Sequence, residues 1–247
     1  MHDLAFLHFP DEARVSQDLV AQARRAAVVS TVSEFSASEL REHWGLDDVR
    51  VVYNGCDPAL FEVAPLGTRQ LRDLGIDRPF VLASGGSTAR KNLKLLAETW
   101  SRVARTTGHQ LVLTGPPDAR RDDLFGSLPG TVATGYLPRS QQLSLMASAR
   151  LLAVPSLYEG FGLPVLEAMA VGTAVITTSC AALPEVAADA ALIVDPDLDG
   201  WVAAMHEVLH DDALIRALEV RGRVRAHEFS WEHSAAQYID LYREVAA

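Results

Sequence analysis

The stretch LLAVPSLYEGFGLPVLEAMAVGTAVITT, residues 151–178, carries the pattern that decides the fold. It opens with a short apolar run, passes through a turn rich in glycine, continues as an apolar helix and ends in a second apolar run. Two apolar runs joined by a helix are typical of parallel strands with a crossover connection. The stretch therefore predicts a strand–helix–strand unit with a sharp turn before the helix.

The same alternation extends along the chain in both directions. Helical patterns separate the predicted strands, which occupy residues 26–33, 49–55, 80–86, 110–115, 151–156, 174–178 and 191–195. Buried strands that alternate with helices predict an α/β fold with a doubly wound, Rossmann-like parallel sheet. Ligands of such sheets bind beyond the carboxyl ends of the strands, so the loops after the strands are the first places to look for function.

Composition excludes several classes of protein. The chain has 247 residues, of which 49% are hydrophobic, and a net charge of −10. That charge argues against non-specific binding to nucleic acid. The two cysteines, Cys56 and Cys180, lie far apart and predict reduced thiols rather than a disulfide framework. No apolar run approaches the roughly 20 residues of a membrane span, so we expect a cytoplasmic protein. Attachment to the inner membrane face stays open.

Two carboxylates bracket the turn within the opening stretch. Gly160 and Gly162 permit positive φ and close approach of a ligand, and Pro164 fits the first turn of a helix. Because helical side chains lean toward the N-terminus, Glu167 can reach back toward the crevice that Glu159 faces. Carboxylates accept hydrogen bonds from vicinal hydroxyls, which suits a ribose or a sugar. Spacing alone supports equally well the alternative that Glu159 is a solvated loop residue and Glu167 an exposed helical residue.

The segment SGGSTARKN, residues 84–92, predicts a site for a diphosphate. Gly85 and Gly86 follow a predicted strand, and Arg90 and Lys91 stand at a helix start, where cations and backbone N–H groups favour anions. The segment matches neither the P-loop nor the dinucleotide-binding pattern, which argues against an ATPase or a dehydrogenase. Basic residues on a solvated helix end are the alternative.

A competing motif is H-E-x-x-H at His206, Glu207 and His210, the pattern of zinc peptidases. A third ligand could come from Glu228 or Glu232. The apolar residues of this helix are expected to form a buried stripe against the core. No further histidine follows at the spacing that zinc peptidases use. A zinc metallopeptidase is therefore a remote alternative.

A pair of D-x-D sequences occurs at Asp195, Asp197 and Asp199. Such pairs hold metals in some sugar-nucleotide enzymes. Here they fall in a loop and at a helix start, where aspartate is a routine cap, so we expect them to be structural.

Taken together, these segments resemble the retaining glycosyltransferases of the GT-B fold, family 4. The resemblance covers roughly residues 26–245, the donor-binding lobe of that family. The segments that carry it are STVSEFSASEL, VVYNGCDPALF, GGSTARKNL, GYLP, VPSLYEGFGLPVLEAMAVGTAVITT, LPEVAADAALIVDP and FSW. The family usually has Val where Cys56 stands and a Gly-Arg pair where the phosphate loop here reads Ser84-Gly85-Gly86.

The resemblance implies a nucleoside-diphosphate sugar as donor substrate, with no metal and no other cofactor. Glu159 would bond the sugar, Glu167 the ribose, and Lys91 with Arg90 the leaving diphosphate. His2 would lie near the donor sugar. The remaining donor-binding positions would be Gly85, Gly86, Gly135, Tyr136, Leu137, Gly160, Phe161, Gly162 and Leu163, of which 135–137 border the base.

Domain organisation follows from the same resemblance. We expect residues 1–45 to be a remnant of the N-terminal acceptor lobe, residues 46–228 to form the donor lobe and residues 229–247 to form a closing helix. A complete lobe of this kind takes on the order of 150 residues, so the chain is expected to be a short or split form of the family.

The expected function is hexosyl transfer to a hydroxyl acceptor with retention of configuration, in the biosynthesis of a glycan, polysaccharide or glycoconjugate. The acceptor could be a saccharide, a lipid-linked sugar or a small molecule. The first alternative is a donor-binding half that is inactive without a partner lobe. A sugar-nucleotide epimerase of the same fold is a nearer relative, which the two glutamates disfavour.

Overall fold

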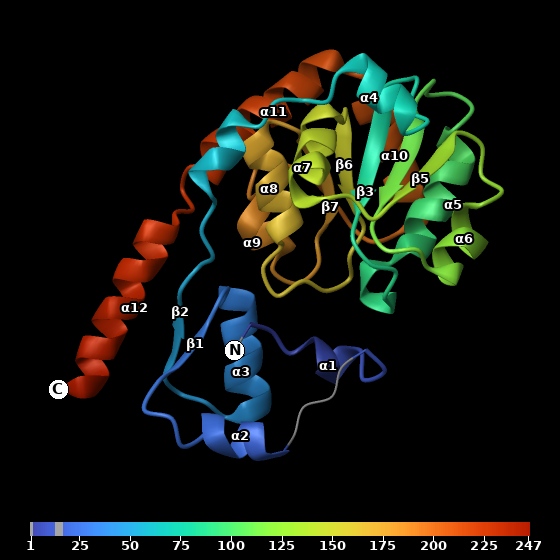
Figure 1. The fold of residues 1–247 in the computed structure, drawn as a ribbon. Helices are drawn as coiled ribbons and strands as arrows, with labels where there is room; N and C mark the ends of the chain where they lie inside the picture. Colours follow the sequence, from blue (N-terminus) through green and yellow to red (C-terminus); the bar gives the residue numbers. More distant parts are fainter. Residues whose placement is uncertain (1, 13–16) are drawn as a thin grey trace.

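The computed structural model describes residues 2–12 and 17–247, and it separates into a large and a small unit (Figure 1). A parallel sheet of six strands forms the centre of the large unit, in the order β5-β4-β3-β6-β7-β8. Its strands are β3 (Phe80–Ser84), β4 (Gln110–Thr114), β5 (Thr131–Gly135), β6 (Leu151–Val154), β7 (Ala174–Thr178) and β8 (Leu192–Val194). The predicted α/β, doubly wound sheet is thus confirmed.

The strand order creates a switch point between β3 and β6. The chain enters the sheet at β3, moves outward to β4 and β5, and then returns past β3 to build β6, β7 and β8 on the other side. Connections after β3 and after β6 therefore leave the sheet in opposite directions. A crevice opens between them at the carboxyl ends of the two strands, and ligands of doubly wound sheets bind there.

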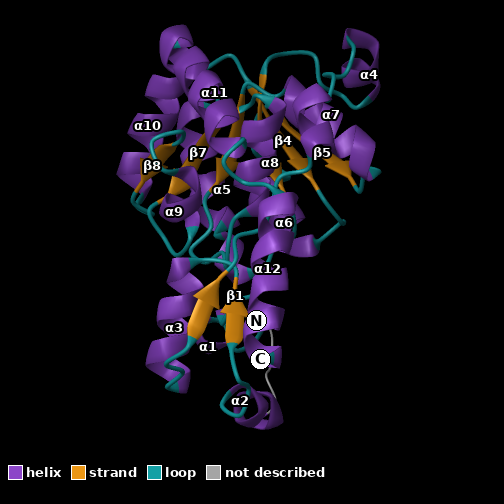
Figure 2. Ribbon diagram, turned by 90° about the vertical axis from the view of Figure 1, so that its left-hand side faces the viewer, coloured by secondary structure: helices purple, strands orange, loops and turns teal. Residues whose placement is uncertain are grey.

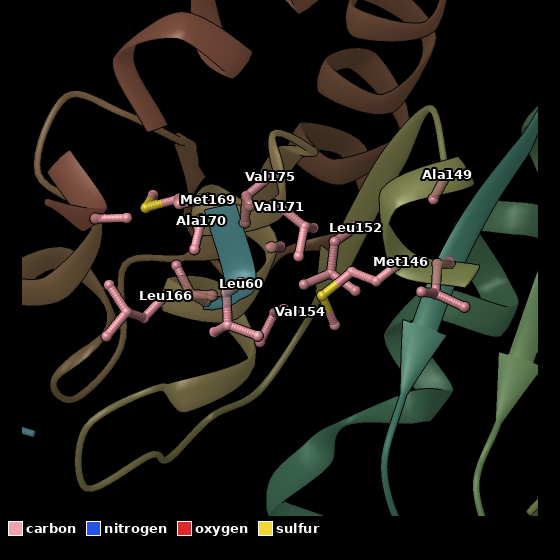
Figure 3. Packing of buried hydrophobic residues seen from close by; sticks show 14 of the residues in the cluster. Leu60, Met146, Ala149, Leu152, Val154, Leu166, Met169, Ala170, Val171 and Val175 are labelled. Carbon is pink, nitrogen blue, oxygen red and sulfur yellow. The ribbon is translucent and has the colours of Figure 1, made fainter. Parts of the chain in front are cut away.

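Helices cover both faces of the sheet because the strand residues alternate. Phe80 and Leu82 of β3 belong to one apolar cluster, and Val81 and Ala83 belong to the other. One face is packed by α5 (Leu93–Val103), α6 (Ala119–Phe125) and α10 (Leu198–His210), and the other by α7 (Arg139–Ser148), α8 (Leu163–Val171) and α9 (Leu183–Ala187). Figure 3 shows Met146, Leu152, Val154, Leu166 and Val171 in the second of these clusters.

The small unit has a core of its own, made of Leu4, Ala37, Leu40, Trp44 and Val49 with their neighbours. Along the sequence, one helix separates its two parallel strands. The elements are α1 (Ala5–His8), α2 (Gln17–Ala23), β1 (Val29–Thr31), α3 (Glu34–Trp44) and β2 (Val49–Val51). Short helices η1 (Pro58–Glu62) and α4 (Thr68–Asp73) then lead into the large sheet.

The last two helices tie the units together. Helix α11 (Asp212–Ala226) packs on α8 of the large unit, and α12 (Trp231–Ala246) then runs alongside the small unit (Figures 1 and 2). Arg50 of the small unit meets Glu244 of α12 at 3.0 Å, and Ser234 of α12 donates over 2.6 Å to the carbonyl of Tyr53, just after the small unit. The closing helix therefore fixes the small unit against the rest of the chain.

Two local details concern the starts of helices. The Ser33 hydroxyl caps α3 by accepting from the Ser36 amide over 3.0 Å, and Ser36 lies buried within the helix. Arg90 and Lys91, expected at a helix start, lie in a short 3₁₀ turn, η2 (Ala89–Lys91), which Asn92 at φ +49° separates from α5. The expected division at residue 45 falls between α3 and β2, which belong to one unit; we propose a division after Val51.

No helix in the described part of the chain is long and apolar enough to cross a membrane.

Candidate functional site

Glu159 lies at the centre of a cluster of polar and charged groups just beyond β6. Its side chain is 9% exposed. The Nζ atom of Lys91 lies 2.6 Å from Oε1, and the guanidinium of Arg90 lies 3.0 Å from Oε2. The Ser156 hydroxyl also donates to Oε1, over 2.8 Å. The structure thus brings together the acid and the two cations that the sequence analysis singled out from separate segments.

The switch point explains why these groups meet. Lys91 and Arg90 lie in η2, which leaves the end of β3, while Glu159 follows the end of the neighbouring β6. The two connections are joined directly, because the Leu157 amide donates to the Arg90 carbonyl over 2.7 Å. Glu12 of the small unit also reaches Arg90, accepting from its amide at 3.0 Å and lying 3.4 Å from its Nε. Sequence analysis did not predict this third acid.

A cavity of about 220 Å³ opens beside Glu159 and is lined by His2, Asp3, Arg90 and residues 159–164, among others. His2 lines this cavity and is exposed. Ser33 of the small unit donates to the Gly160 carbonyl over 2.7 Å, so both units contribute to the walls.

The two glycines of the turn serve different purposes. Gly162 takes φ +107°, as predicted. Gly160 does not have positive φ, so that expectation is wrong. It is needed for close packing instead: a Cβ there would lie 2.5 Å from the Asp3 Cβ and 2.8 Å from the His2 carbonyl oxygen.

The N-terminus of α8 faces the same cavity through Leu163 and Pro164. Gly162 is its N-cap residue and provides no side-chain cap. The positive end of a helix that no side chain caps favours a negatively charged ligand. The cavity therefore combines a cationic wall, a carboxylate and a helix N-terminus.

A smaller cavity of about 20 Å³ lies under the loop of Gly85 and Gly86, on the side of Lys91. It has room for about one water molecule. Arg121 of α6 lines it, is 4% exposed and donates to the Gly85 carbonyl. Burial lowers the pKa of this guanidinium, and its Nε has no hydrogen-bond partner within the described chain. A Cβ at Gly115 would lie 2.4 Å from the same carbonyl oxygen, so the loop of Gly85 and Gly86 packs closely on Gly115.

Arg121, like Glu12, is a residue that sequence analysis missed. It stands in the run Ala119-Arg120-Arg121-Asp122, which has the composition of an exposed helix surface. Only the packing of α6 beneath the loop reveals that one of two adjacent arginines is buried at the site.

Glu167 lies in a neighbouring cavity of about 290 Å³, which it lines with Cys56, Arg139, Leu163 and Trp231. Its carboxylate forms a two-pronged ion pair with Arg139, one arm of which measures 3.1 Å. The side chain of Glu167 is 18% exposed and that of Arg139 is 53% exposed. Leu163 lines both cavities, so the two glutamates stand in adjoining rather than identical spaces.

The segment expected to border a base gives a mixed result. Gly135 ends β5 with φ +70°, and the Tyr136 side chain is 77% exposed beyond it. Leu137 is only 8% exposed and belongs to the apolar core, so its side chain does not face a ligand. The ring of Phe161 is also buried, packed against Tyr53 and Phe229, which leaves its backbone to line the cavity.

The zinc-peptidase pattern does not form a ligand set. The rings of His206 and His210 stack 4.4 Å apart, and Nδ1 of His210 is bonded to the His206 carbonyl at 2.7 Å. Within residues 2–12 and 17–247, no third His, Cys, Asp or Glu joins them in a cluster that could hold a metal. Asp197 caps α10 by accepting from the Gly200 amide over 2.8 Å, in line with its predicted structural role.

Comparison with known proteins gives this arrangement a family. The family described as Glycosyl transferases group 1 matches residues 78–211, more than half of the chain, and the chain belongs to it. It is therefore a glycosyltransferase by family, and its sheet is the Rossmann-like lobe of GT-B glycosyltransferase structures.

Individual relatives agree with this assignment. The chain is 31% identical to O-antigen chain mannosyltransferase B of Escherichia coli, over 98% of this chain and 68% of the relative. Sucrose-phosphate synthase from Thermosynechococcus elongatus superposes with a TM-score of 0.78 at 27% identity, over 96% of this chain and 65% of that one. Anabaena HepE in complex with UDP and glucose superposes with a TM-score of 0.79 at 18% identity, over 95% and 69%. The chain thus spans about two thirds of each.

Proposed function

We propose that this chain binds a nucleoside-diphosphate hexose and transfers the hexose to a hydroxyl acceptor with retention of configuration. The observation that carries the proposal is the contact of Glu159 with both Lys91 and Arg90 at the switch point of the sheet. Retention follows from the resemblance of the motifs to family 4.

The two cavities suggest how the donor lies. The hexose occupies the cavity beside His2 and Glu159, where its hydroxyls donate to the carboxylate. The diphosphate lies at the N-terminus of α8 and near Lys91, and the ribose reaches Glu167 in the adjoining cavity. The base then lies toward Gly135 and Tyr136. Leu163, which lines both spaces, marks the point at which the ligand passes from one to the other.

Binding would rearrange the ion pairs. Without a donor, Glu159 pairs with both Lys91 and Arg90, Glu12 supplies a second negative charge to Arg90, and Arg139 pairs with Glu167. A diphosphate competes for the two cations, and ribose hydroxyls compete for Glu167. On binding, the charged side chains would replace their contacts with one another by contacts with the ligand. Because these side chains are already partly removed from water in the free protein, binding costs less desolvation free energy.

Transfer would depend chiefly on charge stabilisation. Negative charge grows on the departing diphosphate while the anomeric carbon becomes positive. Lys91, Arg90 and the N-terminus of α8 are already positioned to stabilise that negative charge. Arg121 acts from below by holding the carbonyl of Gly85. Glu159 serves as a hydrogen-bond acceptor that positions the sugar, because two cations and a hydroxyl already surround it.

The names of the relatives point to the donor sugar. The E. coli relative is a mannosyltransferase, and the Anabaena structure contains UDP and glucose. We therefore propose a mannosyl or glucosyl donor with GDP or UDP as its carrier.

A thermal-shift panel of GDP-mannose, UDP-glucose, ADP-glucose and dTDP-glucose tests the proposal. A ligand at about 100 times its Kd adds roughly 2.7 kcal/mol of stability, which raises the Tm of a chain of this size by several degrees. One sugar nucleotide should do so, and Glu167→Gln should reduce the shift. The exposed acid Glu207, changed to Gln, is the matched control and should keep it. No shift with any of the four would reject the proposal.

The second candidate is a donor-binding half that needs a partner lobe for transfer. The chain spans about two thirds of the length of the relatives that it matches. A transfer assay with labelled donor and a panel of saccharide acceptors separates the two candidates. Donor hydrolysis or transfer by the chain alone would exclude the inactive half, whereas donor binding without turnover would support it.

A further inference from the structure

A cluster of metal-ligating side chains lies in the small unit, outside the proposed donor site. We propose that His8, Glu39 and His43 form a binding site for a divalent transition metal, with Zn²⁺ as the ion that suits them best. This proposal goes beyond the function proposed above and does not depend on it.

Helix geometry brings the three residues together. Glu39 and His43 are four residues apart on α3, so both side chains stand on one face of that helix. His8 ends α1 and approaches this face, and its Nε2 contacts Oε1 of Glu39. One ligand atom from each of the three side chains lies within 4.8 Å of the others. The rings of His8 and His43 meet edge to face, with centroids 6.2 Å apart.

The donor set matches the chemistry of zinc. Two imidazoles and one carboxylate make a ligand set that zinc proteins use, with the fourth position left for water or another ligand. Both histidines are exposed, so water and the ion can reach the open side of the cluster, while the Glu39 carboxylate is buried.

A second layer of contacts fixes the carboxylate. The Tyr158 hydroxyl donates to Oε2 of Glu39 and itself accepts from the Leu4 amide over 3.0 Å. The Tyr158 ring lies 5.2 Å from that of His8. Groups that orient a ligand in this way are a regular feature of metal sites. Since Tyr158 directly precedes Glu159, a metal here would hold α1 and α3 firmly against the turn that carries the donor site.

A simpler interpretation is an ion pair between protonated His8 and Glu39. Such a pair is worth little when one partner is exposed, and it gives no role to His43. The two interpretations differ in whether His43 matters, and His43 is exposed, so its replacement does not threaten the fold. The H-E-x-x-H segment at 206–210 has the more familiar zinc spacing and serves as an internal control.

The test uses the untagged chain, stripped with EDTA and titrated with Zn²⁺ by calorimetry, with metal content measured after dialysis. We expect one equivalent of zinc on the wild type. His43→Ala and His8→Ala should each weaken binding at least tenfold, and Tyr158→Phe about tenfold because the carboxylate loses its orienting bond. The double variant His206→Ala/His210→Ala should bind as the wild type does.

Three results would overturn the proposal. They are no zinc bound by the wild type at micromolar concentrations, unchanged affinity in His43→Ala, and loss of zinc from the His206→Ala/His210→Ala variant. Circular dichroism of each variant confirms that altered binding is not a loss of fold.

Discussion

Glu159 and Glu167 stand eight positions apart in one strand–turn–helix unit, yet their surroundings differ. Glu159 is almost fully buried and contacts two cations and a hydroxyl within 3.0 Å. Glu167 is partly exposed and shares its charge with one arginine that is itself half exposed. From this difference we expect Glu159 to contribute to stability as well as to ligand binding, and Glu167 mainly to ligand binding.

The largest effect is expected for Lys91→Ala in a form of the protein that transfers sugar. Loss of a group that stabilises developing charge typically lowers kcat by about 10²–10³. The fold should survive, because Glu159 keeps Arg90 and Ser156 as partners. Turnover is measured with saturating donor. An unchanged kcat would remove Lys91 from the chemistry.

Glu159→Gln should lower the free energy of unfolding, which distinguishes the surroundings of Glu159 from those of Glu167. Removing the carboxylate leaves two cations without their main partner, which costs about 1–3 kcal/mol. The cost stays below that of a fully buried pair because Lys91 and Arg90 are both partly exposed. Urea unfolding of the variant and the wild type measures it. A variant as stable as the wild type would mean that the cluster has no structural role.

Glu167→Gln should weaken donor binding while leaving the stability of the fold nearly unchanged. Its partner Arg139 is half exposed, so the free energy of unfolding should change by less than about 1 kcal/mol. Donor affinity should fall about tenfold, since a hydrogen bond to a charged group contributes roughly 1.5–3 kcal/mol. Calorimetric titration with the donor found in the panel measures this. A large loss of stability with unchanged affinity would reverse the assignment of the two regions.

The smallest effect is expected for Arg139→Ala. Arg139 occupies the Glu167 carboxylate that the ribose needs, so its removal should tighten donor binding by a few-fold. Arg102→Ala, which breaks the exposed pair with Asp199, is the matched control and should leave affinity unchanged. Weaker binding in Arg139→Ala would mean that the arginine itself contacts the donor.

Much of the fold and part of the candidate site could be predicted from the sequence. The bounds of α8 and β7 agree with the apolar runs that predicted them, because Gly162 before α8, Pro164 in its first turn and Gly172 after it leave few alternatives. Glu159, Arg90 and Lys91 could be singled out from residue type and position after a strand. Their meeting follows from the adjacency of β3 and β6, which the alternation of strands and helices implies but does not specify.

What the sequence could not supply depends on tertiary packing. Arg121 has the same local setting as Arg120, yet it alone is buried beneath the loop. Leu137 looks like a loop residue beside a ligand and is part of the core. The contact of Glu12 with Arg90 joins segments 78 residues apart, and no local pattern marks it.

The central claim is that one ligand spans both regions, with its sugar at Glu159 and its ribose at Glu167. Calorimetry of the free nucleoside diphosphate and of the complete sugar nucleotide, on Glu159→Gln and Glu167→Gln, tests it most directly. We predict that the diphosphate loses affinity only in Glu167→Gln, while the sugar nucleotide loses affinity in both variants. Equal losses for both ligands in Glu159→Gln, or none in Glu167→Gln, would contradict the account.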